Sequence, residues 1–188
     1  MKVRLLLAAC LLATAPALAE TGRLPDKFLK FEAASIGIQG EGAVQTQRGY
    51  NSWVAMPMRL ADVTLAWRRL RVGATALDDD AGYGHNGNIM VLPVHVGVTL
   101  ASRTRRVWKV YSTSPDVYLE ARGGLLDKSL AVNPELRVAL GSNWDFVVAG
   151  LRLEAGVVCY RLVYEVGRPE STVYATLQAR LLTFGVGF

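Results

Sequence analysis

Residues 147–159 alternate strictly between two kinds of side chain. One parity, which starts at Val147 and ends at Cys159, is entirely apolar, whereas the other carries Arg152 and Glu154 at its middle. A period of two is typical of a β-strand, because successive side chains point to opposite faces of the chain. The segment is therefore predicted to be a strand with one apolar face and one charged face.

Seven further segments show the same alternation and are separated by turn-forming residues. The predicted strands cover residues 30–39, 52–67, 70–76, 89–101, 107–122, 132–141, 147–159 and 171–188. In the second strand the apolar parity reverses part-way, which predicts a bulge near residues 57–60. Pro115 is expected to interrupt the fifth strand. No segment predicts a helix, so the fold class is all-β.

The predicted strands are joined alternately by tight turns and by longer polar loops. The turns are expected at residues 68–69, 103–106 and 142–145, and the loops at 41–51, 78–88, 123–131 and 167–170. Eight strands that run alternately up and down bring both ends of the chain to the same side. The pattern therefore predicts an eight-stranded antiparallel up-and-down barrel.

The polar faces of the fifth, sixth and seventh strands repeat a pair of opposite charges. The six residues are Glu120, Arg122, Glu135, Arg137, Arg152 and Glu154. An arginine on a lipid-facing surface would cost about 2–4 kcal/mol, whereas charges inside a barrel can neutralise one another. We therefore expect an interior charge network, in which Arg152→Ala destabilises more than the double change Arg152→Ala/Glu154→Ala. The alternative is a solvated outer face with weak ion pairs.

The tryptophans are expected near the two ends of the predicted strands. Trp67, Trp108 and Trp144 lie beside the three turns, and Trp53 lies near the opposite end. Tyr50, Tyr164 and Tyr174 also fall near that opposite end. Two aromatic girdles are typical of a transmembrane barrel, although tryptophans also flank turns in soluble sheets.

The first residues have the features of a secretory signal peptide. Lys2 and Arg4 precede a short apolar run, and Ala17-Leu18-Ala19 forms an A-x-A cleavage site. We expect residues 1–19 to be removed and residues 20–188 to form one domain. A second possibility is lipid modification at Cys10. Cleavage after residue 19 leaves Cys159 as the only cysteine, which excludes an internal disulfide.

The net charge gives no support for nucleic-acid binding. The formal charge of +5 falls to +3 once Lys2 and Arg4 are removed, and the remaining basic residues are spread evenly. Beyond the leader no apolar run reaches the roughly 20 residues that a membrane-spanning helix requires. Any crossing of a membrane would therefore use strands.

The carboxyl terminus ends in alternating apolar residues, Phe184, Val186 and Phe188. This ending resembles the C-terminal strand signature of bacterial outer-membrane barrels, which the barrel assembly machinery recognises. Gln178 and Arg180 continue the same parity, so we expect either a bulge in the last strand or an early exit from the apolar zone. The mature chain as a whole resembles small eight-stranded outer-membrane barrels of the outer-membrane protein A transmembrane-domain type.

The resemblance implies a monomeric transmembrane β-barrel in the outer membrane of a Gram-negative bacterium, in contact with outer-membrane lipid. Eight strands leave an interior that side chains can fill. We therefore expect a structural or surface-interaction role, with the loops as the contact surface, rather than a general porin. No cofactor, metal or catalytic site is predicted, because the acidic segment at residues 78–82 lacks the alternating ligands of a calcium loop.

Two alternatives to this role stay open. An outer-membrane lipid-modifying enzyme would need His85 or His95 beside a serine, for which Ser102, Ser112 and Ser114 are the available candidates. A secreted soluble β-barrel that binds a lipophilic ligand would need the apolar parity to point inward.

Overall fold

The computed structural model describes residues 27–43, 51–79, 89–107, 110–126, 130, 132–146, 148–161 and 172–188. Every regular element within these ranges is a β-strand. The strands are β1 (Lys27–Ala43), β2 (Asn51–Ala55), β3 (Met58–Trp67), β4 (Leu70–Asp79), β5 (Ile89–Val91), β6 (Val94–Val107), β7 (Val110–Leu126), β8 (Val132–Asp145), β9 (Gly150–Arg161), β10 (Thr172–Arg180) and β11 (Thr183–Gly187). No helix among the described residues is long and apolar enough to cross a membrane.

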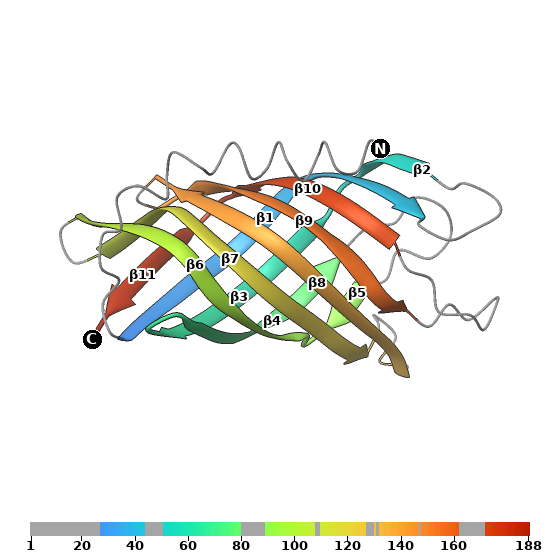
Figure 1. The fold of residues 1–188 in the computed structure, drawn as a ribbon, viewed down its shortest axis with the longest axis horizontal. Helices are drawn as coiled ribbons and strands as arrows, with labels where there is room; N and C mark the ends of the chain where they lie inside the picture. Colours follow the sequence, from blue (N-terminus) through green and yellow to red (C-terminus); the bar gives the residue numbers. More distant parts are fainter. Residues whose placement is uncertain are drawn as a thin grey trace.

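Eight of these strands close into an antiparallel barrel, as the alternation predicted (Figure 1). The pairing runs from β1 through β3, β4, β6, β7, β8, β9 and β10 and returns to β1. The short strands β2, β5 and β11 directly precede or follow β3, β6 and β10 in the chain. Because sequential strands are neighbours throughout, the topology is up-and-down.

The two ends of the barrel differ in their connections. At one end, which we call the turn end, residues 68–69 join β3 to β4, residues 146–149 join β8 to β9, and the chain finishes at Phe188. At the other, the loop end, β1, β4, β7 and β9 finish. The predicted loops fall largely outside the described residues.

The wall at the turn end is completed by β11. Beyond the β8–β9 connection, β11 pairs with β1 on one side and with β7 on the other, at Gly185 and Tyr111. The buried Phe28 ring lies against Gly185 at this level. The interior is therefore filled by an aromatic side chain at the turn end.

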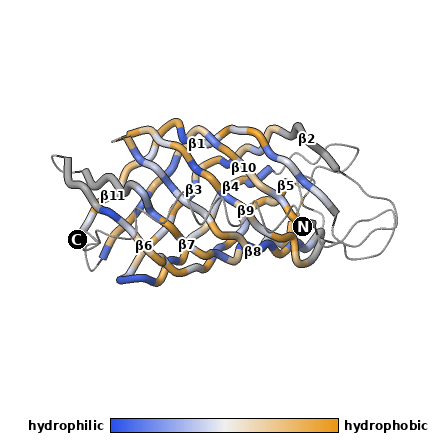
Figure 2. The backbone as a smooth tube through the Cα atoms, turned by 45° about the horizontal axis from the view of Figure 1, so that its top comes forward, coloured by the Kyte–Doolittle hydropathy of each residue, from blue (hydrophilic) through white to orange (hydrophobic). Residues whose placement is uncertain are grey.

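Apolar and polar side chains separate cleanly between the outside and the inside of the wall. Hydropathy alternates along the strands in Figure 2. The exposed large hydrophobic residues occupy the outer parity of every barrel strand, for example Leu65, Val96, Leu119, Leu151 and Leu177. The buried positions between them are mostly polar or charged. The apolar parity therefore faces outward, which contradicts the soluble lipophile-binding alternative.

The alternation switches parity once along each of five adjacent strand lines. At each switch two successive apolar residues lie outside or half-buried: Ala33–Ala34, Leu60–Ala61, Ala76–Leu77, Val91–Leu92 and Leu181–Leu182. The switches lie side by side, because Ala34 pairs with Leu60, Leu60 with Leu77 and Leu77 with Val91. Two of these residues have a left-handed backbone, Ala61 (φ 50°) and Leu92 (φ 52°). Because of each switch, which we also call a kink, the apolar side chains point outward both before and after it along the strand.

The switches explain two features of the sequence pattern. The reversal in the predicted second strand is confirmed, with a break at Met56–Pro57 and a parity switch at Leu60–Ala61. The last strand slips at residues 181–182, so Gln178 and Arg180 are buried inside while Val186 and Phe188 stay outside. Of the two explanations expected for that strand, the bulge is the correct one.

Several predicted boundaries were wrong. Residues 103–106 continue β6, and residues 142–145 belong to β8. In both cases, pairing with a neighbouring strand continues through a polar segment that resembled a turn. Pro115 lies within β7, but the pairing of β7 with β6 shifts register there, between Ser102 and Thr104. Met90 lies inside although it shares the parity of the exposed Leu92 and Val94, because the switch at Val91–Leu92 intervenes. Residues 41–43, 78–79 and 123–126, expected in loops, extend β1, β4 and β7.

Candidate functional site

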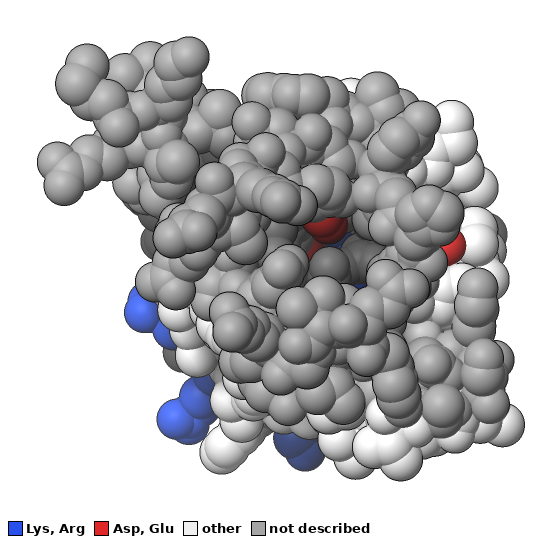
Figure 3. Space-filling view, turned by 90° about the vertical axis from the view of Figure 1, so that its right-hand side faces the viewer, with Lys and Arg blue, Asp and Glu red and all other residues white. Residues whose placement is uncertain are grey.

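The interior of the barrel is the most unusual part of the described structure, because it is filled with ionisable side chains. Nine carboxylates are buried there: Glu32, Glu41, Asp62, Asp78, Asp116, Glu120, Glu135, Asp145 and Glu154. Seven bases are buried with them: Lys30, Arg59, Arg71, Arg122, Arg137, Arg152 and Arg180. Figure 3, which views the molecule from the loop end, shows acidic side chains within a central hollow.

Near the turn end, two aspartates are shared between two bases. The Lys30 Nζ atom lies 2.9 Å from Asp145 Oδ2 and 3.7 Å from Asp116 Oδ2. Arg71 Nη1 donates to the same Asp116 Oδ2 at 2.8 Å. The Arg71 guanidinium also lies over the Tyr118 ring, 4.7 Å from its centroid. This cluster joins β1, β4, β7 and β8 across the interior.

Glu32 is the centre of the next cluster. Arg152 Nη2 donates to Glu32 Oε2 at 3.0 Å, and Arg180 Nε donates to the same oxygen. Arg152 Nε also donates to Asn143 Oδ1 at 3.1 Å, and Arg180 reaches Asp145 through Nη1. Guanidinium groups from β9 and β10 therefore share one carboxylate from β1.

Glu154 is held mainly by phenolic hydroxyl groups. Tyr118 donates to Glu154 Oε2 and Tyr174 donates to Glu154 Oε1, both at 3.1 Å. The guanidinium of Arg59 lies farther away, with its Nη2 atom 3.8 Å from Glu154 Oε1. Hydrogen bonds from two sides satisfy this carboxylate, as a buried charge requires.

Toward the loop end, three arginines surround Asp78. The distances to its carboxylate are 3.2 Å from Arg59 Nε, 3.3 Å from Arg122 Nη1 and 3.8 Å from Arg137 Nη1. Arg122 Nη2 also donates to Glu120 Oε1 at 2.8 Å, and Arg137 donates to Glu135. The interior is thus a chain of clusters that connects non-adjacent strands.

All six charged residues singled out in the sequence lie in this interior and are buried. Glu120 contacts Arg122, and Glu135 contacts Arg137, each within one strand. The expected pair of Arg152 with Glu154 is wrong, because Arg152 binds Glu32 and Glu154 binds the two tyrosines. For Arg152 and Glu154, in contrast to the other two pairs, the interior offers each side chain a partner on another strand.

The residues that join the clusters were not predicted from the sequence. Three of them lie near a switch of parity, which hid their inward direction: Lys30, Glu32 and Arg180. The other three lie beside predicted loops and breaks: Asp78, Asp116 and Asp145. The signal that marks four of the five kinks is a pair of apolar residues between two polar ones, as in Arg59-Leu60-Ala61-Asp62.

Four interior rings lie over glycines of neighbouring strands. Gly73, Gly141 and Gly156 pair directly with His95, Tyr118 and Tyr174, and the Phe28 ring covers Gly185. A Cβ atom at Gly141 would lie 2.6 Å from Tyr118 Cε2, and one at Gly156 would lie 2.8 Å from the Tyr174 hydroxyl oxygen. These glycines leave the space in which the rings lie flat against the wall.

His95 lies beside the hydroxyl group of Thr64 and the carboxylate of Asp62. Among the described residues, no serine is seen in contact with it. Its Nε2 atom is 3.0 Å from Thr64 Oγ1, and its Nδ1 atom is 3.7 Å from Asp62 Oδ1, too far for a hydrogen bond. All three side chains are buried, and Gly73 lies directly against the imidazole ring. The arrangement places His95 as an interior polar residue beside Thr64. His85 lies outside the described residues, as do the side chains of Ser112 and Ser114.

The remaining predicted residues lie on the outer surface or outside the described part. Trp67 is exposed beside the β3–β4 turn, and Trp144 is half-buried near the end of β8. Trp108 and the Trp53 side chain lie outside the described residues. Tyr174, expected in the girdle, is instead buried inside against Glu154.

At the carboxyl terminus, Phe184 is half-buried and packs against Phe31, with ring centroids 5.4 Å apart. Val186 and Phe188 are exposed on the outer face. Among the described residues, no group of His, Cys, Asp and Glu side chains is arranged to hold a metal ion.

Comparison with known proteins does not assign the chain to a family. No protein-family model matches the sequence, and no curated protein matches it at a significant level.

Proposed function

We propose that the protein is a small outer-membrane β-barrel of a Gram-negative bacterium, with a structural or surface-interaction role. The observation that carries the proposal is the distribution of polarity in a closed barrel. Large apolar side chains cover the outside, and sixteen charged side chains of the described residues are buried inside. A water-soluble protein gains free energy from the opposite arrangement, because moving apolar surface out of water is favourable.

The side-chain-filled interior argues against a general porin. Clusters of ion pairs cross the lumen at several levels, from Lys30 with Asp145 to Arg137 with Glu135. Phe28 fills the turn end. An eight-stranded barrel has no space for an open aqueous channel beside such contents. The protein then acts through its wall and its loops, with lipid as the surrounding partner.

The signal peptide and the last strand support the same proposal. A cleavable leader at residues 1–19 would deliver the chain to the periplasm, and Phe184, Val186 and Phe188 would present the terminal strand to the barrel assembly machinery. Catalysis is not proposed, since His95 is buried and its described hydrogen-bond neighbour is Thr64 rather than a serine.

The test is to express the full chain in a Gram-negative host and to separate the cell envelope from the periplasm. The protein should be found with the outer membrane, should require detergent for extraction, and should migrate differently on a gel before and after boiling. Recovery from the soluble periplasm with unchanged mobility on boiling would contradict the proposal. Single-channel recording in planar bilayers separates the porin alternative, for which a stable, wide conductance is expected.

A further inference from the structure

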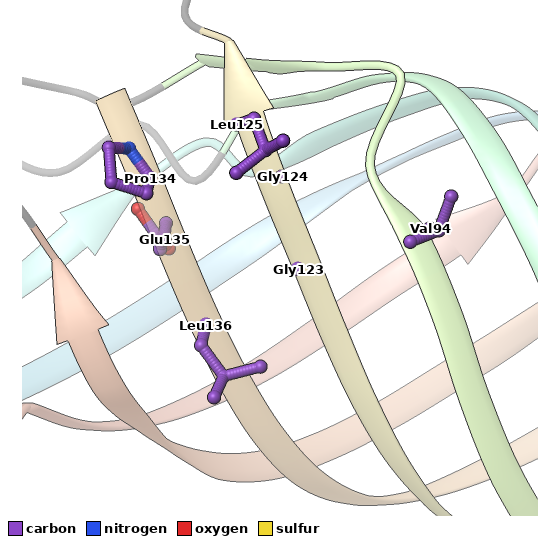
Figure 4. Close-up of a pocket in the computed structure, with 7 residues that line it drawn as sticks. All are labelled: Val94, Gly123, Gly124, Leu125, Pro134, Glu135 and Leu136. Atoms are coloured by element: carbon purple, nitrogen blue, oxygen red, sulfur yellow. The ribbon is translucent and has the colours of Figure 1, made fainter. Parts of the chain in front are cut away.

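The outer face of the barrel has an open apolar depression toward the loop end. It has a volume of about 380 Å³ and is lined by Val94 of β6, by residues 123–125 of β7 and by residues 134–136 of β8 (Figure 4). The side chains that project around it are Val94, Leu125, Pro134 and Leu136. We call this depression the β7 groove.

The β7 groove exists because one outward position has no side chain. Val94, Gly123 and Leu136 lie opposite one another on three successive strands, so a glycine separates two large apolar residues. A Cβ atom at Gly123 would meet its nearest neighbours at 3.4–3.6 Å, which is ordinary contact distance. Close packing therefore does not require the glycine at this position.

The charged side chain next to the β7 groove points into the barrel. The Glu135 carboxylate is fully buried and accepts a hydrogen bond from Arg137 inside the barrel. Gly124 faces the interior, where its Cβ atom would meet Met90. Among the described residues, the projecting side chains of the groove are therefore all hydrocarbon. A molecule bound there gains free energy from van der Waals contact and from burial of its apolar surface. The projecting side chains offer no polar group that would orient it.

The size of the β7 groove selects one kind of occupant. A specific protein interface uses roughly 20–30 residues on each side, whereas seven residues line this groove. Ligand pockets begin at roughly 300 Å³, so the observed volume suits one narrow apolar chain. The groove also continues the exposed apolar surface of the barrel, which includes Val94 and Leu125.

We infer that the β7 groove binds an acyl chain of a membrane lipid, in the leaflet next to the loop end. This inference rests on the proposed function, because it requires the outer face to lie in a bilayer. Gly123 is the residue that makes the site, since any larger outward side chain would occupy the space of the acyl chain.

The experiment uses the mature protein in vesicles of phosphatidylethanolamine and phosphatidylglycerol that contain phosphatidylethanolamine with a diazirine on one acyl chain. After irradiation, mass spectrometry maps the labelled residues. We expect labelling at Val94, Leu125 and Leu136 to exceed labelling at Leu151 and Leu177, which are outward residues of β9 and β10. In Gly123→Leu this excess should be lost.

Ala155→Leu is the matched control, because it enlarges a half-buried small residue on the outward parity of β9 and should keep the excess. Heat-modified gel mobility checks that each variant is folded. Equal labelling of all outward positions in the wild type, or an unchanged excess in Gly123→Leu, would overturn the groove while leaving the membrane location intact. Absence of label from every outward position would overturn the membrane location and the groove together.

Discussion

The Glu32 cluster gives the sharpest energetic prediction. Glu32→Gln keeps the shape of the side chain but removes the charge that two guanidinium groups share. Arg152→Met removes one of those guanidinium groups, while Glu32 keeps Arg180 as a partner. We therefore expect Glu32→Gln to destabilise the barrel more than Arg152→Met does.

The contact distances set the magnitude. Arg152 Nη2 lies 3.0 Å from Glu32 Oε2, and at an effective dielectric constant near 20 two unit charges this close attract by about 5 kcal/mol. Removing a buried charge also removes its desolvation cost, and removing one partner of a buried pair costs about 3–5 kcal/mol net. Arg152→Met should lie at the lower end of that range and Glu32→Gln at the upper end.

The assay is equilibrium urea unfolding in lipid vesicles, followed by tryptophan fluorescence and by gel mobility without boiling. The double variant Glu32→Gln/Arg152→Met should lose about 1–3 kcal/mol less than the sum of the single variants, because the two residues are in contact. The matched cycle pairs Arg152→Met with Glu154→Gln. Its coupling should be smaller than that of the Glu32–Arg152 cycle, since Arg152 donates to Glu32 and Glu154 accepts from the two tyrosines.

Two results would refute this reasoning. The first is additivity of Glu32→Gln and Arg152→Met, which would mean that the contact between the two side chains contributes nothing to stability. The second is a larger coupling in the Arg152–Glu154 cycle, which would restore the pairing expected from the sequence alone.

Changes at three other positions test the packing of the wall and the direction of its outer face. Gly141→Ala should destabilise by about 1–3 kcal/mol in the same unfolding assay, because the added methyl group clashes with the Tyr118 ring; wild-type stability would show that the ring moves freely. Leu65→Arg should cost about 2–4 kcal/mol in vesicles if this outward position lies near the bilayer midplane, whereas no cost in unfolding would place the position in water. Cys159, which is exposed, should react with a membrane-soluble maleimide and be protected by lipid from a charged one; equal reaction with both reagents would contradict a lipid-facing position.

The barrel itself could be predicted from sequence because its pattern is repeated and local. In β9 the alternation of apolar residues with Arg152 and Glu154 identifies both faces without knowledge of any neighbour. The alternation alone does not say which face points outward, because a soluble sheet shows the same alternation with its apolar face turned inward. The closed barrel of the structure was needed to decide this.

The interior partners could not be predicted, because they depend on geometry across the lumen. Glu32 meets Arg180 although 148 residues separate them, and alternation along one strand carries no information about that distance. The kinks add a second obstacle, since one misjudged parity at residues 181–182 places Arg180 outside instead of inside. The turn at residues 68–69 is confirmed. The turn expected at residues 142–145 was wrong because Asn143 and Asp145, which resemble turn residues, accept hydrogen bonds from arginines inside the barrel.

The central claim, that the outer parity of a closed barrel faces lipid on every side, has one direct test. Nitroxide labels are attached at Leu65, Val96, Leu151 and Leu177, one at a time, in a Cys159→Ser background and in lipid vesicles. Paramagnetic resonance then compares the access of oxygen, which partitions into the bilayer, with the access of a water-soluble nickel chelate. We expect high oxygen access and low chelate access at all four positions. High chelate access at these positions, or labels immobilised in a packed core, would contradict it.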